Sequence, residues 1–217
     1  MDTGLRRAWT EIVTADDYDA HMLAVGQARA AAELTRWLID STAPAPGSRI
    51  AIAGAGTGQM LDFLDPALLR PYQLTFSDLN PAFLARLRER LTRRGLDAET
   101  IEDDIENTAL APGAALLVAT LLLEHIDWRR GAEAFAALRP AACGVILQQN
   151  PPGMTSSLTP GRTVPASLAR ALEIGRPTLV PNEELISFMS TRGYACRETG
   201  LREVADGKRL VALRFTP

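Results

Sequence analysis

Three glycines at alternate positions, placed directly after a short apolar run, constrain the fold of this chain more than any other feature. The run Arg49–Ala53 is apolar after its first residue and is bounded by turn residues, which is typical of a strand buried on both faces of a parallel sheet. Gly54, Gly56 and Gly58 follow without a break. Glycines at such a point let the backbone turn tightly and approach a ligand closely, next to the exposed N–H groups of the following helix.

The rest of the chain continues this alternation of apolar runs and helical patterns. Strands are expected at residues 72–77, 98–101, 114–120, 143–148, 195–204 and 209–215, and helices at 16–40, 59–64, 80–94, 128–138, 165–174 and 182–191. The proline-rich segment 150–165 predicts a long loop, and Asp206 with Gly207 is a hairpin-turn signal. We therefore expect an α/β fold, with a Rossmann-like, doubly wound, mostly parallel seven-stranded sheet that ends in an antiparallel hairpin.

The chain length fits one sizeable core. Its 217 residues leave little room for a second independent domain. We expect residues 1–45 to form an N-terminal helical cap on a main domain of residues 46–217, in a single folding unit.

Charge and composition indicate which classes of partner the chain can bind. The formal net charge of −3 gives no global field that would attract a nucleic acid. Arginines gather between residues 86 and 94 at helical spacing, which predicts the solvated face of an amphipathic helix. The longest uncharged apolar run, 109–123, is short and contains Pro112 and Gly113, so no membrane span is expected. The sequence leaves a monomer and a homodimer equally open.

The two cysteines predict no disulfide and no metal site. Cys143 and Cys196 lie far apart in sequence, without partners at ligand spacing. The N-terminal residues also lack the apolar core of a signal peptide. We therefore expect a cytoplasmic protein with two thiols.

Acidic residues follow the expected strands in order. Asp78 ends the second strand, Asp103 and Asp104 end the third, and residues 122–127 (Leu-Leu-Glu-His-Ile-Asp) follow the fourth. Ligands of parallel sheets bind outside the carboxyl ends of the strands, where these side chains would meet. Each feature also has an ordinary structural explanation, such as a tight turn, a helix N-terminal charge or an acidic loop.

Two phosphate-binding alternatives fit the glycine loop less well. A dinucleotide fingerprint needs glycine or alanine three residues after the second glycine, where this chain has Gln59. A P-loop needs a Gly-Lys-Ser/Thr ending, which is absent. The run Gln149–Pro152 is similar to the Asn-Pro-Pro-aromatic motif of nucleic-acid amino-methylating enzymes, but Gly153 replaces the aromatic residue and the run follows the fifth strand.

The ordered motifs resemble those of class I S-adenosylmethionine-dependent methyltransferases, in the broad group of small bacterial proteins with a type 11/12 methyltransferase domain. The resemblance covers about residues 49–150 and rests on the glycine loop 54–58, the strand end 77–81, the pair 104–105 and the run 123–126. It implies S-adenosyl-L-methionine as the cofactor and a small molecule as the methyl acceptor.

The resemblance also implies a role for each matched position. The glycine loop would pack against the methionine and ribose parts of the cofactor, Asp78 would bind the ribose hydroxyls, and Leu79 would lie against the adenine. Asp104 would meet the adenine amino group, Ile105 would back the ring, and Thr120 would lie near the sulfonium. The N-terminal helix would act as a lid. The cofactor-binding residues expected on this basis are Gly54, Ala55, Gly56, Gly58, Asp78, Leu79, Asp104, Ile105, Thr120, Tyr18 and Gln27.

One departure concerns the strand before the glycine loop. Family members usually carry an acidic residue two positions before the first glycine, where this chain has Ile52. This leaves open a non-catalytic or regulatory S-adenosylmethionine-binding protein as the alternative to an enzyme.

His125 is the candidate catalytic base, because it follows the fourth strand beside the expected reactive end of the cofactor. A role as a helix cap is the ordinary alternative. His21, in the first helix, is a further candidate for lining the site. The apolar residues Met154, Leu158, Leu168, Leu172 and Leu179 predict an apolar wall for a small, partly apolar acceptor.

Overall fold

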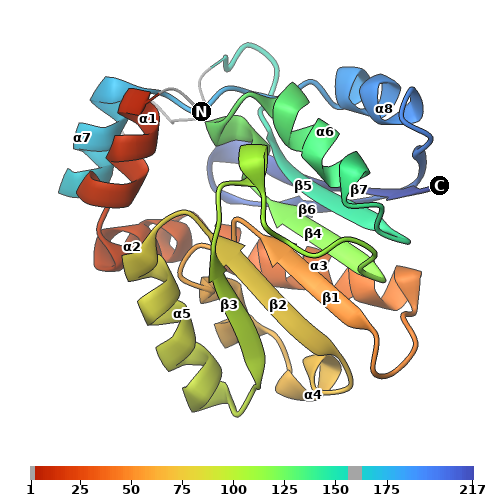
Figure 1. The fold of residues 1–217 in the computed structure, drawn as a ribbon. Coiled ribbons are helices and arrows are strands. Elements are labelled where there is room, and N and C mark those ends of the chain that lie inside the picture. Colours follow the sequence, from red (N-terminus) through yellow and green to blue (C-terminus); the bar gives the residue numbers. More distant parts are fainter. Residues whose placement is uncertain (1–2, 156–162) are drawn as a thin grey trace.

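Seven strands form one sheet in the order β3-β2-β1-β4-β5-β7-β6 (Figure 1). The computed structural model describes residues 3–155 and 163–217. Strands β1 to β5 pair in parallel, and β7 is antiparallel to both β5 and β6. The strands are β1 (Arg49–Ala53), β2 (Gln73–Asp78), β3 (Ala98–Glu102), β4 (Leu116–Thr120), β5 (Cys143–Gln149), β6 (Ala195–Glu203) and β7 (Arg209–Thr216). The predicted fold class is confirmed.

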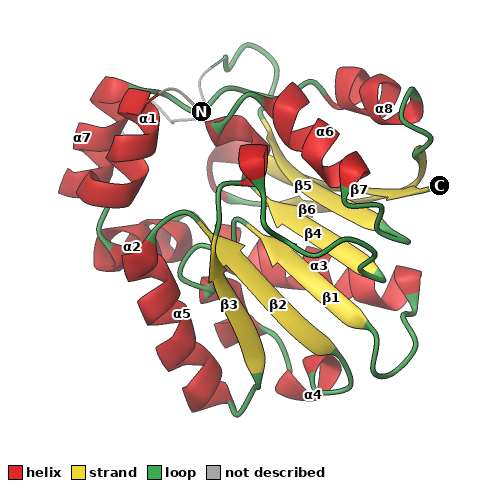
Figure 2. Cartoon of the chain, viewed as in Figure 1, coloured by secondary structure: helices red, strands yellow, loops and turns green. Residues whose placement is uncertain are grey.

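Helices cover both faces of the sheet (Figure 2). The core on one face joins α3, α4 and α5 to the strands, and the core on the other joins α6 and α8. Alternate residues of β1 divide between the two, with Ile52 in the first core and Ala51 in the second, as a strand with two buried faces requires. The helices are α1 (Thr3–Arg7), α2 (Ala15–Ala24), α3 (Gln27–Thr42), α4 (Pro66–Leu69), α5 (Pro81–Arg94), α6 (Trp128–Ala137), α7 (Ala166–Ile174) and α8 (Asn182–Ser190).

Short helical turns complete the architecture. A π-helical turn, Ala8–Ile12, continues α1, and 3₁₀ turns span Gln59–Phe63, Ile105–Asn107, Leu123–His125 and Ala205–Gly207. Three of these turns directly follow the carboxyl-terminal ends of β1, β3 and β4 or their loops. They shape the same edge of the sheet at which the acidic residues were expected.

The start of α5 shows how the sequence fixes this edge locally. Asn80 caps the helix, because its Oδ1 accepts from the backbone N–H of Ala82 at 2.8 Å and of Phe83 at 3.2 Å. Pro81 fills the first helical position, where a missing N–H costs nothing. The cap holds the end of β2 close to the first turn of α5.

Several predicted boundaries were wrong for local reasons. The helix expected at 16–40 is divided into α2 and α3 at Gly26, whose φ of 76° lies in the left-handed region. The run after the glycine loop is a 3₁₀ turn, and Pro66 begins α4 instead of ending a helix. Strand β4 begins at Leu116, two residues later than expected. The helical turns at residues 3–12 were not predicted.

The arginine-rich face of α5 is only partly solvated. Arg88 and Arg93 are exposed as expected, but Arg90 is buried. Its guanidinium donates to Asp62 at 2.8 Å, to Asp19 at 2.9 Å and to the carbonyl of Thr57 at 2.7 Å. Arg90 therefore ties α2 and the glycine loop to α5, because a buried guanidinium requires partners for its donors.

The expectations of no disulfide and no membrane span can be compared with the described part of the chain. Cys143 and Cys196, both described, are free thiols. None of the helices in the ranges 3–155 and 163–217 combines the length and apolar character of a membrane span. The division at residue 45 stays a prediction, although α3 packs against the sheet with Leu34 and Leu38.

Candidate functional site

A pocket opens at the carboxyl-terminal ends of β1, β2 and β4, and we call it the glycine-loop pocket. Most of the residues expected to bind the cofactor line it, together with His125. Its lining residues are Trp9, Tyr18, Gly54, Gly56, Ser77, Asp78, Leu79, Asn80, Phe83, Asp103, Asp104, Ile105, Thr120, Leu121, Leu122, His125 and Ile126. Residues spaced along the sequence therefore meet at one sheet edge.

The glycine loop is folded against Asp78. Gly54 and Gly56 have φ angles of 63° and 58°, in the left-handed region that disfavours a side chain. The backbone N–H of Gly56 donates to Asp78 Oδ2 at 2.7 Å, and that of Ala55 donates to the carbonyl of Ser77 at 2.9 Å. A Cβ on Gly56 would come within 2.9 Å of Tyr18 Cε1. The absence of a side chain at Gly56 thus lets the Tyr18 ring lie directly against the loop.

Asp78 is a half-buried carboxyl with polar contacts on both oxygens. Its Oδ1 accepts from the backbone N–H of Asn80 at 2.9 Å, and its Oδ2 from Gly56. Burial raises the pKa of Asp78 to about 6, although these backbone N–H groups act in the opposite direction. A carboxylate oxygen can accept more than one hydrogen bond, so Asp78 can also accept a hydrogen bond from a ligand hydroxyl.

The third strand end contributes Asp104 and Ile105. Ile105 is buried, and Asp104 Oδ1 accepts from the backbone N–H of Glu106 at 3.1 Å. Asp104 also forms an ion pair with Arg6 of the N-terminal α1. This pairing places α1 against the pocket and occupies the carboxylate that was expected to meet the adenine amino group.

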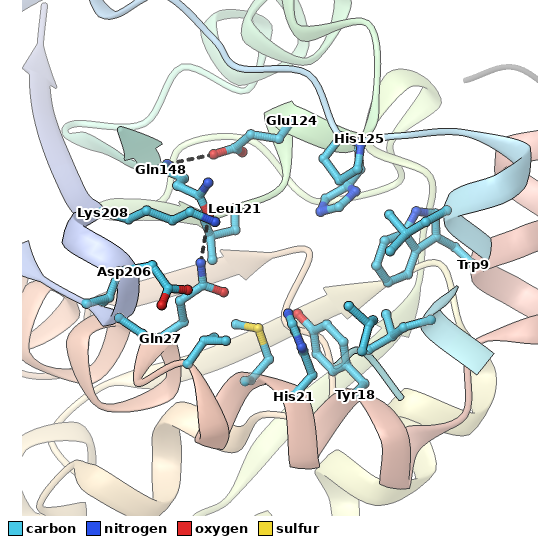
Figure 3. A pocket seen from close by; sticks show the side chains of 18 residues that line it. Trp9, Tyr18, His21, Gln27, Leu121, Glu124, His125, Gln148, Asp206 and Lys208 are labelled. Carbon is cyan, nitrogen blue, oxygen red and sulfur yellow. Dashed lines mark hydrogen bonds between the residues drawn. The ribbon is translucent and has the colours of Figure 1, made fainter. Parts of the chain in front are cut away.

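A second pocket adjoins the first, and we call it the histidine pocket (Figure 3). The two pockets share Trp9, Tyr18, Leu121 and His125. The full lining of the histidine pocket is Trp9, Tyr18, His21, Met22, Val25, Gln27, Leu121, Glu124, His125, Gln148, Val164, Leu168, Leu172, Pro177, Val204, Ala205, Asp206 and Lys208.

Aromatic side chains form the boundary between the pockets. The ring centroids of Trp9 and His125 are 4.5 Å apart in an edge-on contact, and Tyr18 stacks on Phe83 at 4.9 Å. His125 points into the histidine pocket from the side opposite Tyr18 and His21 (Figure 3). Burial lowers the pKa of His125 to about 4, so the ring is neutral at pH 7. Its Nδ1 is buried and has no hydrogen-bond partner among the described residues.

Polar side chains gather at one end of the histidine pocket, where β5 ends. Gln27 Nε2 donates to Gln148 Oε1 at 2.9 Å, and the backbone N–H of Gln148 donates to Glu124 Oε1 at 2.8 Å (Figure 3). Lys208 and Asp206 line the same end (Figure 3). Burial raises the pKa of Glu124 to about 7. The rest of the lining is largely apolar, so the pocket fits an amphipathic molecule.

The structure separates the predicted residues into three groups. Gly54, Gly56, Asp78, Leu79, Asp104, Ile105, Thr120 and Tyr18 line the glycine-loop pocket. Gln27 lines the histidine pocket instead, beside His21. Ala55 and Gly58 line neither pocket. A Cβ on Gly58 would meet Leu87 Cδ1 at 2.4 Å, so this glycine permits close packing of the loop against α5.

The predicted apolar wall is partly present. Leu168 and Leu172 of α7 line the histidine pocket, whereas Met154 and Leu179 do not. Leu158 lies outside the described residues. No group of three or more potential metal-ligating side chains occurs in the part of the chain that is described.

Sequence reasoning missed three contributors to the site. Trp9 reaches it through tertiary packing of the N-terminal turns, where the Asn80 amide donates to the Trp9 carbonyl at 2.6 Å. Glu124 belonged to a recognised motif but was assigned no role. Gln148 lies one residue before the end of β5, where a ligand contact could have been expected. Ile52 is buried in the core, so the position of the usual family acid is filled by apolar packing.

Comparison with known proteins was made in sequence and in structure. Residues 50–141 match a protein family described as "Methyltransferase domain". No curated protein matches the chain.

Solved structures share the fold at low sequence identity. Magnesium protoporphyrin IX methyltransferase from Synechocystis PCC 6803, with bound S-adenosylhomocysteine (SAH), aligns with a TM-score of 0.66 and 13% identity over 86% of this chain and 81% of that chain. The [4+2]-cyclase SpnF aligns with a TM-score of 0.64 and 14% identity, over 86% of this chain and 80% of that chain. Geranyl diphosphate C-methyltransferase from Streptomyces coelicolor A3(2) aligns with a TM-score of 0.63 and 13% identity, over 86% of this chain and 78% of that chain.

Proposed function

We propose that this chain, a class I S-adenosylmethionine-dependent methyltransferase, transfers the methyl group to a small, partly apolar molecule bound in the histidine pocket. The observation that supports this most is the junction of two pockets at Trp9, Tyr18, Leu121 and His125. One pocket has the expected cofactor residues, and the other has an apolar lining with one polar end.

The residues of the glycine-loop pocket suit the cofactor. Gly56 lines this pocket without a side chain, and Thr120 Oγ1 is buried without a partner in the described ranges. In this proposal Asp78 accepts from the ribose hydroxyls, while Leu79 and Ile105 enclose the adenine. Asp104 accepts from the adenine amino group once Arg6 releases it. Buried unpaired polar atoms at a pocket wall favour a polar ligand, because they otherwise stay unsatisfied.

S-adenosylmethionine, when bound, supplies a methyl group already activated on its sulfonium. The chain then has to align the acceptor and exclude water. Trp9 and Tyr18 close the boundary of the two pockets with aromatic surface, which keeps the transfer region dry. His125 lies at the same boundary and is neutral at pH 7, so its ring can take a proton from a protic acceptor.

A small acceptor is favoured over a nucleic acid. The net charge is −3, and the histidine pocket is lined mainly by apolar side chains. Two of the solved structures with this fold are named as methyltransferases of magnesium protoporphyrin IX and of geranyl diphosphate.

The first test is calorimetric titration with SAH, the demethylated cofactor. We expect micromolar binding that Asp78→Ala weakens at least about tenfold. Glu99→Ala, on an exposed side chain of β3 outside both pockets, is the control and should bind SAH as the wild type does. Absence of wild-type binding at millimolar SAH would refute the proposal.

The second test follows the methyl group itself, because a cyclase shares this fold. Protein and S-adenosylmethionine with a ¹³C-labelled methyl group are incubated with a small-molecule extract, and labelled products are identified by mass spectrometry. We expect label in a low-molecular-weight product, with loss of most of the rate in His125→Ala and retained SAH affinity. SAH binding without any labelled product would instead support the regulatory alternative.

A further inference from the structure

Glu124 lines the histidine pocket, and one of its carboxylate oxygens has no hydrogen-bond partner among the described residues. The residue is only 4% exposed, and its Oε1 already accepts from the backbone N–H of Gln148 at 2.8 Å. Its Oε2 is buried and has no hydrogen-bond partner among the described residues. A buried carboxylate oxygen without a donor is costly, so a donor supplied by a ligand would stabilise it.

The backbone around Glu124 is held rigidly. Its carbonyl accepts from the backbone N–H of Thr178 at 2.8 Å, which joins it to the loop between α7 and α8. Leu123, the preceding residue, is fully buried in the core. The side chain is fixed at its tip by Gln148, so Oε2 has a defined position relative to the end of β5. A preorganised acceptor atom of this kind distinguishes ligands by the group they carry there.

Glu124 also lies apart from the transfer region. It lines the histidine pocket and not the glycine-loop pocket, whereas His125 lines both. Gln27 and Gln148, hydrogen-bonded to each other at 2.9 Å, occupy the same polar end (Figure 3). A methyl acceptor that spans the pocket therefore has its reacting atom near His125 and a second polar group near Glu124.

We propose that Glu124 is a specificity-determining residue whose Oε2 accepts a hydrogen bond from a hydroxyl or amino group of the methyl acceptor. This inference rests on the proposed function, because it assigns the histidine pocket to the acceptor. The acceptor class is an apolar molecule with a hydrogen-bond donor away from the methylated atom. A ketone, ether or ester oxygen at the same place is rejected when Glu124 is ionised, since two acceptor oxygens then face each other without a proton.

The chemistry of Glu124→Gln makes the inference sharply testable. In the variant, only the amide oxygen can accept from the Gln148 N–H, so the amide NH₂ takes the place of Oε2. The preferred ligand group then changes from a donor to an acceptor. A structural role of Glu124 would lower stability without reversing this preference.

The probes are 1-phenylethanol and acetophenone, which share a skeleton and differ in a hydroxyl against a carbonyl group. Their dissociation constants are measured by ligand-observed NMR on SAH-saturated protein. For the wild type at pH 8.5, above the pKa of about 7 of Glu124, we expect 1-phenylethanol to bind about tenfold more tightly than acetophenone, as for a hydrogen bond to a charged group. In Glu124→Gln the ratio should fall to about one or below. Glu184→Gln, an exposed carboxyl of α8 paired with Arg129, should keep the wild-type ratio.

Each outcome has a separate meaning. Failure of wild-type protein to bind SAH counts against the proposed function. SAH binding with equal affinity for the two probes, or with no binding of either below about 50 mM, overturns the role of Glu124, because fragments of this size reach millimolar affinity in a matching pocket. A preference that persists in Glu124→Gln overturns it as well. If that variant does not fold by circular dichroism, Glu124→Leu removes both oxygens and should abolish the preference.

Discussion

Gly56 gives the most direct test of how the glycine loop shapes the glycine-loop pocket. In Gly56→Ala the new Cβ would lie 2.9 Å from Tyr18 Cε1 and 3.3 Å from Tyr18 Oη, in a backbone with φ of 58°. The left-handed backbone costs about 1 kcal/mol for alanine. Moving the Tyr18 ring, which stacks on Phe83, adds about 1 kcal/mol more.

Gly113 is the matched control for this substitution. Its φ is 78°, and a Cβ there would meet nothing within 4 Å. Gly113→Ala thus carries the backbone cost alone. In a chain of this length, about 1 kcal/mol corresponds to about 2–4 °C in Tm. We expect Gly113→Ala to lower Tm by about 2–4 °C and Gly56→Ala by about 4–8 °C.

The binding readout separates the two variants further. SAH affinity, measured by calorimetry, should be unchanged in Gly113→Ala and at least about tenfold weaker in Gly56→Ala, because the Tyr18 ring that the methyl group displaces lines the pocket. In a double-mutant cycle, Gly56→Ala should lower the free energy of unfolding by about 1 kcal/mol less in a Tyr18→Ala background than in the wild type. Equal losses of Tm and equal SAH affinities in the two glycine variants would refute the reasoning.

Three further predictions concern charged side chains. Arg6→Ala should tighten SAH binding up to about fivefold by releasing Asp104, whereas Arg7→Ala, on a neighbouring exposed arginine, should not change the calorimetric Kd. SAH affinity should rise between about pH 5 and 7, because the raised pKa of Asp78 (about 6) leaves its carboxyl protonated and a poorer acceptor below that pH; Asp78→Asn should give a flat profile. Arg90→Met should lower the free energy of urea unfolding by about 3 kcal/mol, since it leaves partly buried carboxylates without their cation; a loss below about 0.5 kcal/mol would show that the ion pairs are dispensable.

The order of the motifs predicted much of the fold and the meeting of the strand ends at one pocket. Each expected strand is present, and the strand ends at Gly54, Asp78, Asp104 and Thr120 line one pocket. Local sequence could determine this much for a physical reason. Burial on both faces requires continuous apolar runs, and parallel strands bring their carboxyl ends to the same edge.

Helix boundaries were less predictable, because a single residue can end a helix inside a continuous helical pattern of apolar residues. The alanine-rich N-terminal segment reads as a single helix, yet Gly26 in a left-handed conformation divides it into α2 and α3. That break lets α2 turn toward the site with Tyr18 and His21, while α3 packs on the sheet. Periodicity reports which face of a segment is apolar, and it does not report a change of direction.

The sequence by itself determined the sheet, the glycine loop and the acids that follow the strands, because these depend on local burial and on chain order. Only the tertiary structure decided that Trp9 lines both pockets, that Arg90 is buried between two acids, and that Glu124 lines the histidine pocket with an oxygen that no described residue hydrogen-bonds. These outcomes depend on partners far away in the chain. Their energies arise from desolvation and hydrogen bonding, which are settled only when the distant segments pack together.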